Sequence, residues 1–405
     1  MIRHLLRLIW NRKRTNLLLM IELFFSFLVL FVVVTLGVFY VDNYRRPLGF
    51  RFDDVWCITV NTNMPGPAMD MKDAGLAATS LGVFRAVQEL PEVEAVASAF
   101  ATAFDEGGWS TAYRVDGRPY AYDLNRVSDG FRDVMGLELV SGRWLSREDD
   151  DSSAVKNVVI NEWLARDFFG SLDAVGRLVP QDKDSGGHER TPERVVGVVR
   201  DFRQRGEYSA PGGYMFRRHQ IEDRLAAPAR ILLVKLRPGT SAAFEERLMK
   251  ALQGAARDWS FKVESLTEKR AFNHQLRLAP VLLIALVSCF LLLMVALGLT
   301  GVLWQNVTQR TREIGLRRAK GATAARIHRQ VLGEVAVMTS LALAAGVLVV
   351  VQFPLLDVMG FVRPGVFATS LAVSAAAIYV LTMVCGFYPG RLATRLSPAE
   401  ALHYE

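Results

Sequence analysis

Four long apolar stretches divide the chain into regions of different pattern. They cover residues 17–41, 278–305, 335–356 and 364–390, and only the first contains a charge, that of Glu22. Each is longer than the ~20 apolar residues that an α-helix needs to cross a bilayer core of roughly 30 Å. The pattern therefore predicts four transmembrane helices. Pro354 predicts that the third helix stops or bends near its outer end.

Between the first two stretches, residues 42–279 carry short apolar runs separated by turn residues. Helical patterns lie at 76–90, 161–169 and 241–257, with Asn161 as an N-cap and Gly170 as a left-handed stop for the middle helix. We expect an α+β domain of two subdomains, because about 240 residues is large for one core. The short apolar runs predict strands at 55–60, 93–97, 113–115, 155–160, 194–199, 231–237 and 261–264.

The net charge of +7 would suit an anionic partner such as nucleic acid, but its distribution points elsewhere. Residues 1–16 hold five basic and no acidic side chains, and residues 306–329 hold seven basic and one acidic. Residues 42–279 hold 33 basic and 35 acidic side chains, so this segment is nearly neutral. Basic residues stay on the cytoplasmic side of a membrane. The charge therefore predicts topology and gives no support for nucleic acid.

The predicted fold is a membrane protein with four transmembrane α-helices and a large α+β extracytoplasmic domain between the first and second helices. Segment 1–16, the loop 306–329 and the tail 391–405 are expected in the cytoplasm. The span 17–41 is read as a retained signal anchor, because it exceeds a signal-peptide core and no small-x-small cleavage pattern follows it. We expect Cys57, the one cysteine outside the spans, in a buried strand or an intermolecular bridge.

Sequence motifs for catalysis are missing from the chain. No Gly-Lys dipeptide occurs, so there is no GxxxxGK[ST] phosphate loop, and no CxxC, HExxH or GxSxG pattern is present. The six histidines are far apart and lack metal-ligand spacing. We therefore predict no catalytic, cofactor-binding or metal-binding residue, and no enzymatic activity of this chain alone.

Two acidic residues, Glu22 and Glu334, lie in or at the predicted spans. A charge in hydrocarbon is costly and often functional. Both lie near the cytoplasmic ends, so pairing with neighbouring arginines is one interpretation. A proton relay and a role in helix–helix contact or coupling are the others.

The cytoplasmic loop 306–329 places apolar residues among basic ones, as a short amphipathic helix does. Thr323 fits an N-cap for the following helix. A solvated basic loop, a helix lying on anionic lipid, and a helix docked on a cytoplasmic partner all fit this pattern.

The run from Arg310 to Ala322 resembles the "ERTREIGIRKALGA" signature of FtsX/MacB-type ABC transporter permeases. The tail is similar to that family's "YPARRAA…DPIEALR" ending, with Tyr388-Pro389-Gly390-Arg391 followed by Ser397-Pro398. The outer segment resembles the MacB-like periplasmic core domain. Its matching residues include Gly142-Arg143, Val158-Val159-Ile160-Asn161-Glu162, Phe169-Gly170, Gly176-Arg177 and Val195-Val196-Gly197.

The resemblance implies a periplasmic core domain over 42–279 and an FtsX-like domain over 280–390. Two permease chains, identical or sister, are expected to meet at their first and second spans, where Gly298 and Gly301 allow close approach. The cytoplasmic loop is expected to dock on an ABC ATPase dimer. Its signature residues are Arg310, Thr311, Arg312, Glu313, Ile314, Gly315, Leu316, Arg317, Lys320, Gly321 and Ala322.

The implied function is that of a permease subunit in the inner membrane. ATP and Mg would bind to a separate ATPase chain, because only 16 residues precede the first span and they suit an interfacial amphipathic helix. Hydrolysis would drive a shape change of the outer domain, termed mechanotransmission. The exported molecules would be peptides, antibiotics or other amphiphiles, with a periplasmic adaptor and an outer-membrane channel as further partners. A lipoprotein-releasing permease and a non-transporting regulator of cell-wall hydrolases are the alternatives.

Overall fold

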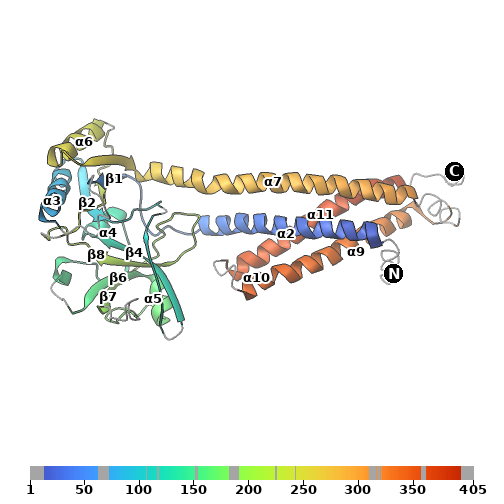
Figure 1. Ribbon diagram of the computed structural model, residues 1–405, viewed down its shortest axis with the longest axis horizontal. Helices are drawn as coiled ribbons and strands as arrows, with labels where there is room; N and C mark the ends of the chain where they lie inside the picture. Colours follow the sequence, from blue (N-terminus) through green and yellow to red (C-terminus); the bar gives the residue numbers. More distant parts are fainter. Residues whose placement is uncertain are drawn as a thin grey trace. The chain divides into compact units, whose positions relative to one another are not determined.

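The computed structural model divides into two compact units, one of Met1–Asp42 with Leu278–Glu405 and one of Asn43–Arg277. We call them the helical unit and the α/β unit, and Figure 1 traces the elements of each. The described residues are 13–62, 73–105, 107–115, 118–150, 154–181, 191–223, 226–241, 243–309, 316, 320, 322–356 and 362–393.

The helical unit is built from four long helices: α2 (Lys13–Tyr44), α7 (Leu266–Gln309), α9 (Ala324–Val350) and α11 (Pro364–Ala393). Helices α2 and α7 run on into the α/β unit, which begins at Asn43 and ends at Arg277. Each of the four is long and apolar enough to cross a membrane, which confirms the four predicted spans. Helix α9 ends at Val350 and the short α10 (Gln352–Leu355) contains Pro354, as predicted.

Side chains of the helical unit pack in one apolar cluster, to which all four helices contribute residues. On α2 the buried side chains include Leu19, Leu23 and Phe27, which recur every four residues and so share one helix face. Phe27 lies against Gly346 of α9, where an added Cβ would meet the ring at 2.4 Å. The glycine therefore makes room for the phenyl ring. Helix α7 leaves much of its surface exposed, including Leu283, Leu286 and Phe290.

The α/β unit contains a ten-stranded sheet in the order β10-β1-β9-β2-β4-β8-β6-β7-β5, with β3 paired only to β4. Its helices are α3 (Ala74–Gln88), α4 (Phe131–Met135), α5 (Glu162–Phe169) and α6 (Ala243–Ala255). The strands are β1 (Val55–Asn61), β2 (Val93–Ala99), β3 (Trp109–Val115), β4 (Arg118–Val127), β5 (Leu139–Gly142), β6 (Lys156–Asn161), β7 (Glu193–Val199), β8 (Gly213–Arg218), β9 (Ile231–Leu236) and β10 (Ser260–Ser265).

The sheet consists of two halves that meet at a single residue pair, Ala99 of β2 with Val127 of β4. One half is the antiparallel set β10-β1-β9-β2. The other is the mixed set β4-β8-β6-β7-β5, in which β4 is parallel to β8 and β6 is parallel to β7. Each half has its own apolar cluster. The two halves share one sheet within one compact unit, and the division into two subdomains stays a prediction.

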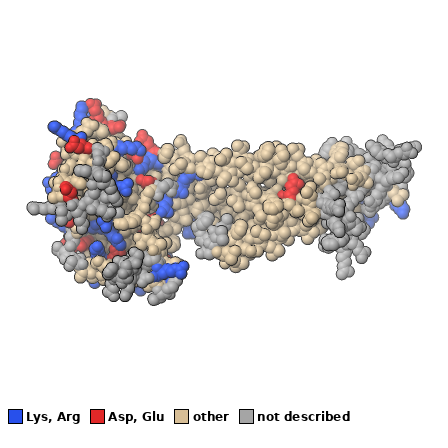
Figure 2. All heavy atoms as spheres, viewed as in Figure 1, with Lys and Arg blue, Asp and Glu red and all other residues tan. Residues whose placement is uncertain are grey.

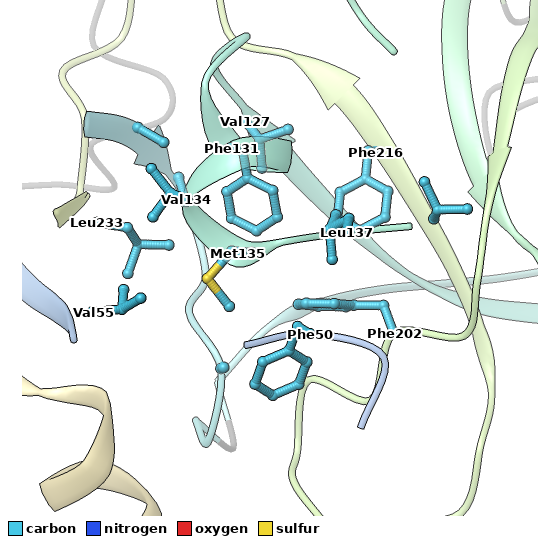
Figure 3. Close-up of a cluster of buried hydrophobic side chains, with 14 of the residues drawn as sticks. Phe50, Val55, Val127, Phe131, Val134, Met135, Leu137, Phe202, Phe216 and Leu233 are labelled. Atoms are coloured by element: carbon cyan, nitrogen blue, oxygen red, sulfur yellow. The ribbon is translucent and has the colours of Figure 1, made fainter. Parts of the chain in front are cut away.

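Alternation along β1 and β9 assigns side chains to the two faces of the first half. Ile58 and Leu232 pack with α3 and α6, while Cys57 and Leu233 face the opposite cluster. Figure 3 shows this second cluster, in which the phenyl groups of Phe131, Phe202 and Phe216 gather with apolar side chains from several elements. Helix α4 and the segments around Phe50 and Phe202 thus close this face of the sheet.

Local signals in the sequence identified much of this unit. Asn161 accepts a hydrogen bond from the Leu164 backbone N–H at the start of α5, and Gly170 ends the helix in the left-handed conformation, as predicted. All seven predicted strands are present, as β1, β2, β3, β6, β7, β9 and β10. Strands β4, β5 and β8 were not predicted. Strand β8 is buried on both faces over Gly213–Phe216, so it lacks the alternation that marks a half-buried strand.

Charged side chains are distributed very differently over the two units (Figure 2). On the face shown, Lys, Arg, Asp and Glu cluster over the α/β unit, and the described helical surface is almost wholly uncharged. A water-facing sheet domain needs such charges, whereas a lipid-facing helix excludes them.

Candidate functional sites

The predicted ATPase-coupling loop lies between α7 and α9. Of its signature residues, Leu316, Lys320 and Ala322 are described. The Lys320 backbone N–H donates to the Leu316 carbonyl over 3.1 Å, the spacing of one α-helical turn, and both side chains are exposed. Thr323 occupies the N-cap position of α9 without a capping side-chain bond. The remaining signature residues lie outside the described residues: Arg310, Thr311, Arg312, Glu313, Ile314, Gly315, Arg317 and Gly321.

Two residues that the sequence singled out separately lie together in the helical unit. A Cβ added to Gly298 of α7 would lie 3.0 Å from the Oε1 atom of Glu22 on α2. The carboxylate therefore packs against the α7 backbone where no side chain intervenes. Pairing of Glu22 with the arginines before residue 15 involves side chains outside the described set. The contact with Gly298 favours the interpretation that Glu22 acts in helix–helix contact.

Gly301 and Glu334 are placed differently. Nothing lies within 4 Å of a Cβ added to Gly301, and this residue is exposed. That leaves the face open for the predicted contact with a second permease chain, which stays a prediction. Glu334 on α9 is half-buried and accepts a hydrogen bond from Gln330 Nε2 at 3.3 Å.

A polar site that the sequence did not reveal lies in the α/β unit, in the loop Arg203–Ser209, which we call the clasp. Arg203 is 3% exposed. Its guanidinium donates to the carbonyl of Asn43, in the last turn of α2, at 2.9 Å and to that of Arg46, just after α2, at 3.0 Å. It also donates to the carbonyls of Glu207 and Ser209 within the clasp. A single buried side chain thus holds two distant segments together.

The clasp is also bonded to α7. Glu207 is 4% exposed, and its carboxylate accepts hydrogen bonds from Arg270 Nε at 2.5 Å and His274 Nε2 at 3.0 Å. Burial alone would raise the pKa of Glu207, but the bonds from His274 and Arg270 outweigh burial and hold that pKa below its usual range. Arg270 and His274 are four residues apart, so they share one face of α7.

Aromatic contacts add to the hydrogen bonds of the clasp. The ring of Tyr44, the last residue of α2, stacks on Tyr208 at 5.8 Å, and Tyr208 lies 5.1 Å from the His274 ring. Gly206 has a φ of +85° and lies close to Phe104 and Asn273. Asn273 Nδ2 in turn donates to the Phe104 carbonyl at 3.3 Å. The clasp therefore joins the end of α2, the first turns of α7 and the core beside them.

The clasp has only a weak signal in the sequence. The four-residue spacing of Arg270 and His274 and the turn residue Gly206 are visible there. Their common partner Glu207 lies more than sixty residues away, and no local rule pairs them. Cys57 is buried in β1, the first of its two predicted settings. Within the described ranges, no group of three or more His, Cys, Asp or Glu side chains is arranged to hold a metal ion.

Four apolar helices with an α/β unit between the first two define a multi-pass membrane protein. A model of the MacB-like periplasmic core domain matches residues 17–251, more than half of the chain. A model of the FtsX-like permease C-terminal domain matches residues 285–398. The chain belongs to the family of MacB/FtsX-like ABC transporter permeases, as its motifs suggested. Members of this family work with an ABC ATPase.

The chain is similar to several named proteins. It is 27% identical over 367 residues to the macrolide export ATP-binding/permease protein MacB of Hahella chejuensis, covering 87% of this chain and 53% of that protein. It is 28% identical over 297 residues to the uncharacterized ABC transporter permease YvrN of Bacillus subtilis, covering 69% of each. The chain thus spans about half the length of the ATP-binding/permease relative.

Among solved structures, the periplasmic region of MacB from Actinobacillus actinomycetemcomitans matches 55% of this chain and 93% of that one. The identity is 18% and the TM-score 0.36.

Proposed function

We propose that this chain is the permease subunit of a MacB-like ABC transporter that exports peptides, antibiotics or other amphiphiles. The observation that carries the proposal is the joint match of a periplasmic core domain and an FtsX-like permease domain to one chain. The relatives named as macrolide and pyoverdine exporters support an export role. A periplasmic adaptor and an outer-membrane channel complete the proposed route.

ATP hydrolysis is assigned to a separate subunit. Both matched models describe permease domains, and the 405 residues contain no GxxxxGK[ST] phosphate loop. ATP and Mg would therefore bind only to the partner, which docks on the cytoplasmic loop around Glu313. The basic loop and N-terminal segment support a cytoplasmic position for both.

Transport in this proposal is mechanical. ATP-driven closure of the ATPase dimer moves the helices, and the α/β unit changes shape outside the membrane. The clasp supports this mechanism because it bonds the α/β unit to the last residues of α2 and the first turns of α7.

The test is co-purification of the full chain with its ATPase subunit and measurement of ATP turnover. We expect turnover by the complex and none by the purified chain. Glu313→Arg should reduce the yield of the complex about tenfold while the chain still inserts. The matched control is Glu246→Arg, because Glu246 lies exposed on α6 in the α/β unit. Turnover by the isolated chain, or an unchanged yield with Glu313→Arg, would contradict the assignment.

A further inference from the structure

The clasp connects three chain segments that are far apart in sequence. Arg203 bonds the segment after α2, Glu207 bonds α7, and both belong to one seven-residue loop. Just before the clasp, Phe202 lies in the core and its ring is 5.1 Å from that of Phe50. A displacement at either helix would reach the core through this loop.

The bonds of the clasp are of a kind that resists displacement. Arg203 and Glu207 are almost fully buried, and breaking one bond would leave a buried charge without its partner. The guanidinium is rigid and always charged, so its donors point in fixed directions. Phe104 adds constraint, because it has a φ of +61° and its backbone N–H donates to the Gln204 carbonyl at 2.7 Å.

We propose that the clasp fixes the outer turns of α7 and the segment after α2 to the α/β core, so that they move as one body. Arg203 and Glu207 are the positioning residues of this connection. The proposal rests on the proposed function, in which helix movement must reach the α/β unit. Without the clasp, α7 would move while the core stayed in place.

The bond between His274 and Glu207 has a defined direction. A carboxylate only accepts hydrogen bonds, so His274 Nε2 donates to Glu207. The His274 ring also contacts the rings of Tyr44 and Tyr208.

The experiment measures the distance between spin labels on α3 and α7. Gln88 and Gln275 are exposed and are replaced by labelled cysteines, in full-length chain carrying Cys289→Ser and bound to its co-purified ATPase subunit. In the native clasp we expect one narrow distance that is the same with and without MgATP. With Glu207→Gln the distribution should become about twice as wide and should shift with MgATP.

Two further variants separate positioning from folding. His274→Phe keeps the ring contacts with Tyr44 and Tyr208 but loses the bond to Glu207. It should widen the distance distribution as Glu207→Gln does. Glu207→Asp keeps the charge and should restore part of the narrow distance. The matched control is Glu246→Gln on α6, which should change nothing.

A narrow, MgATP-independent distance in Glu207→Gln would overturn the proposal, and so would the same result in His274→Phe. The proposed function is tested separately by ATP turnover of the same samples. If the native complex hydrolyses no ATP, the proposed function fails. The width of the distribution without ATP still reports whether the clasp holds α7.

Discussion

Two carboxylates, one in each unit, illustrate how the helical and α/β units treat a buried charge. Glu207 in the α/β unit is almost fully buried but receives hydrogen bonds from Arg270 and His274. Glu22 in the helical unit is half-buried and lies against the bare backbone of Gly298. A charge is tolerated in the first case because partners replace water. In the second case, Gly298 has no side chain and therefore leaves space for the Glu22 carboxylate.

The two units also differ in what their buried polar side chains bond. In the α/β unit, buried polar side chains such as Arg203 and His219 tie segments together through directed bonds. In the helical unit, buried Ser370, Ser374 and Thr339 bond carbonyls of their own helices. An exposed hydrogen bond between Ser340 and Tyr379 joins α9 to α11, and the buried cluster between the helices is apolar. Polar substitutions should therefore be most damaging in the α/β unit, and changes of size in the helical unit.

The largest effect is expected at Arg203. Arg203→Ala removes a buried side chain that bonds several carbonyls, and should lower the free energy of unfolding of the α/β unit by about 3–5 kcal/mol. Denaturant titration of the full chain, followed by tryptophan fluorescence, measures this. Arg200→Ala is the control, since its pair with Glu138 is exposed, and it should cost less than about 1 kcal/mol. Equal losses of unfolding free energy in Arg203→Ala and Arg200→Ala would show that the burial of Arg203 does not determine its contribution.

A pH effect of similar size is expected at His219. Its Nε2 donates to the Ala227 carbonyl and its Nδ1 accepts from Ser98, and burial lowers its pKa to about 4 despite the opposing carbonyl bond. The nearby Arg126 and Arg218 lower it further. The folded chain keeps this ring neutral, so no cost arises above the ordinary pKa of 6.5.

Stability should therefore fall as the pH drops from 6.5 towards 4, by up to about 3 kcal/mol from this group. The measurement is the free energy of unfolding at pH 7, 5.5 and 4.5 for the native chain and for His219→Gln. The variant should lose less stability over this range. Parallel curves for the two proteins would show that His219 contributes nothing.

In the helical unit, we expect the size of the side chain at each glycine position to determine the stability of the helix packing. Gly346→Ala should destabilise the helices by about 1–3 kcal/mol, because the new Cβ would meet the fully buried Phe27 ring. Gly298→Ala should cost less, since the atom in its way is the end of the flexible Glu22 side chain. Gly301→Ala has free space and is the control. Unfolding in a denaturing detergent ranks the three, and any other order would contradict this packing.

The smallest effect is expected for Glu22→Gln. Neutralising a carboxylate that packs on a glycine should leave the helical unit as stable as before, within about 1 kcal/mol. The same change at Glu207 should cost more, because Arg270 and His274 lose their charged partner. Comparing the unfolding curves of the two variants tests the difference between Glu22 and Glu207 directly. A larger loss at Glu22 would indicate a basic partner for that residue.

The sequence identified features that follow from local rules. Apolar length predicted the spans, short apolar runs predicted β1 and β9, and the cap at Asn161 predicted the start of α5. Glu22 and Gly298 were both selected, but their contact was not, because it joins helices with no sequence relation. The clasp was missed for the same reason. Hydrogen bonds between side chains and distant carbonyls leave no period or spacing in the sequence.

The single pair joining Ala99 to Val127 has a consequence for the order in which the chain folds. All strands from β3 to β8 fall within residues 109–218, inside the gap between β2 and β9. That half of the sheet can form as soon as its own residues have been made. The antiparallel half β10-β1-β9-β2 can form only later, because Trp56 of β1 pairs with Ser265, near the C-terminal end of the unit. Its long loop closure should make it the slower step. The half that carries α3 and α6 is thus completed just as α7 begins.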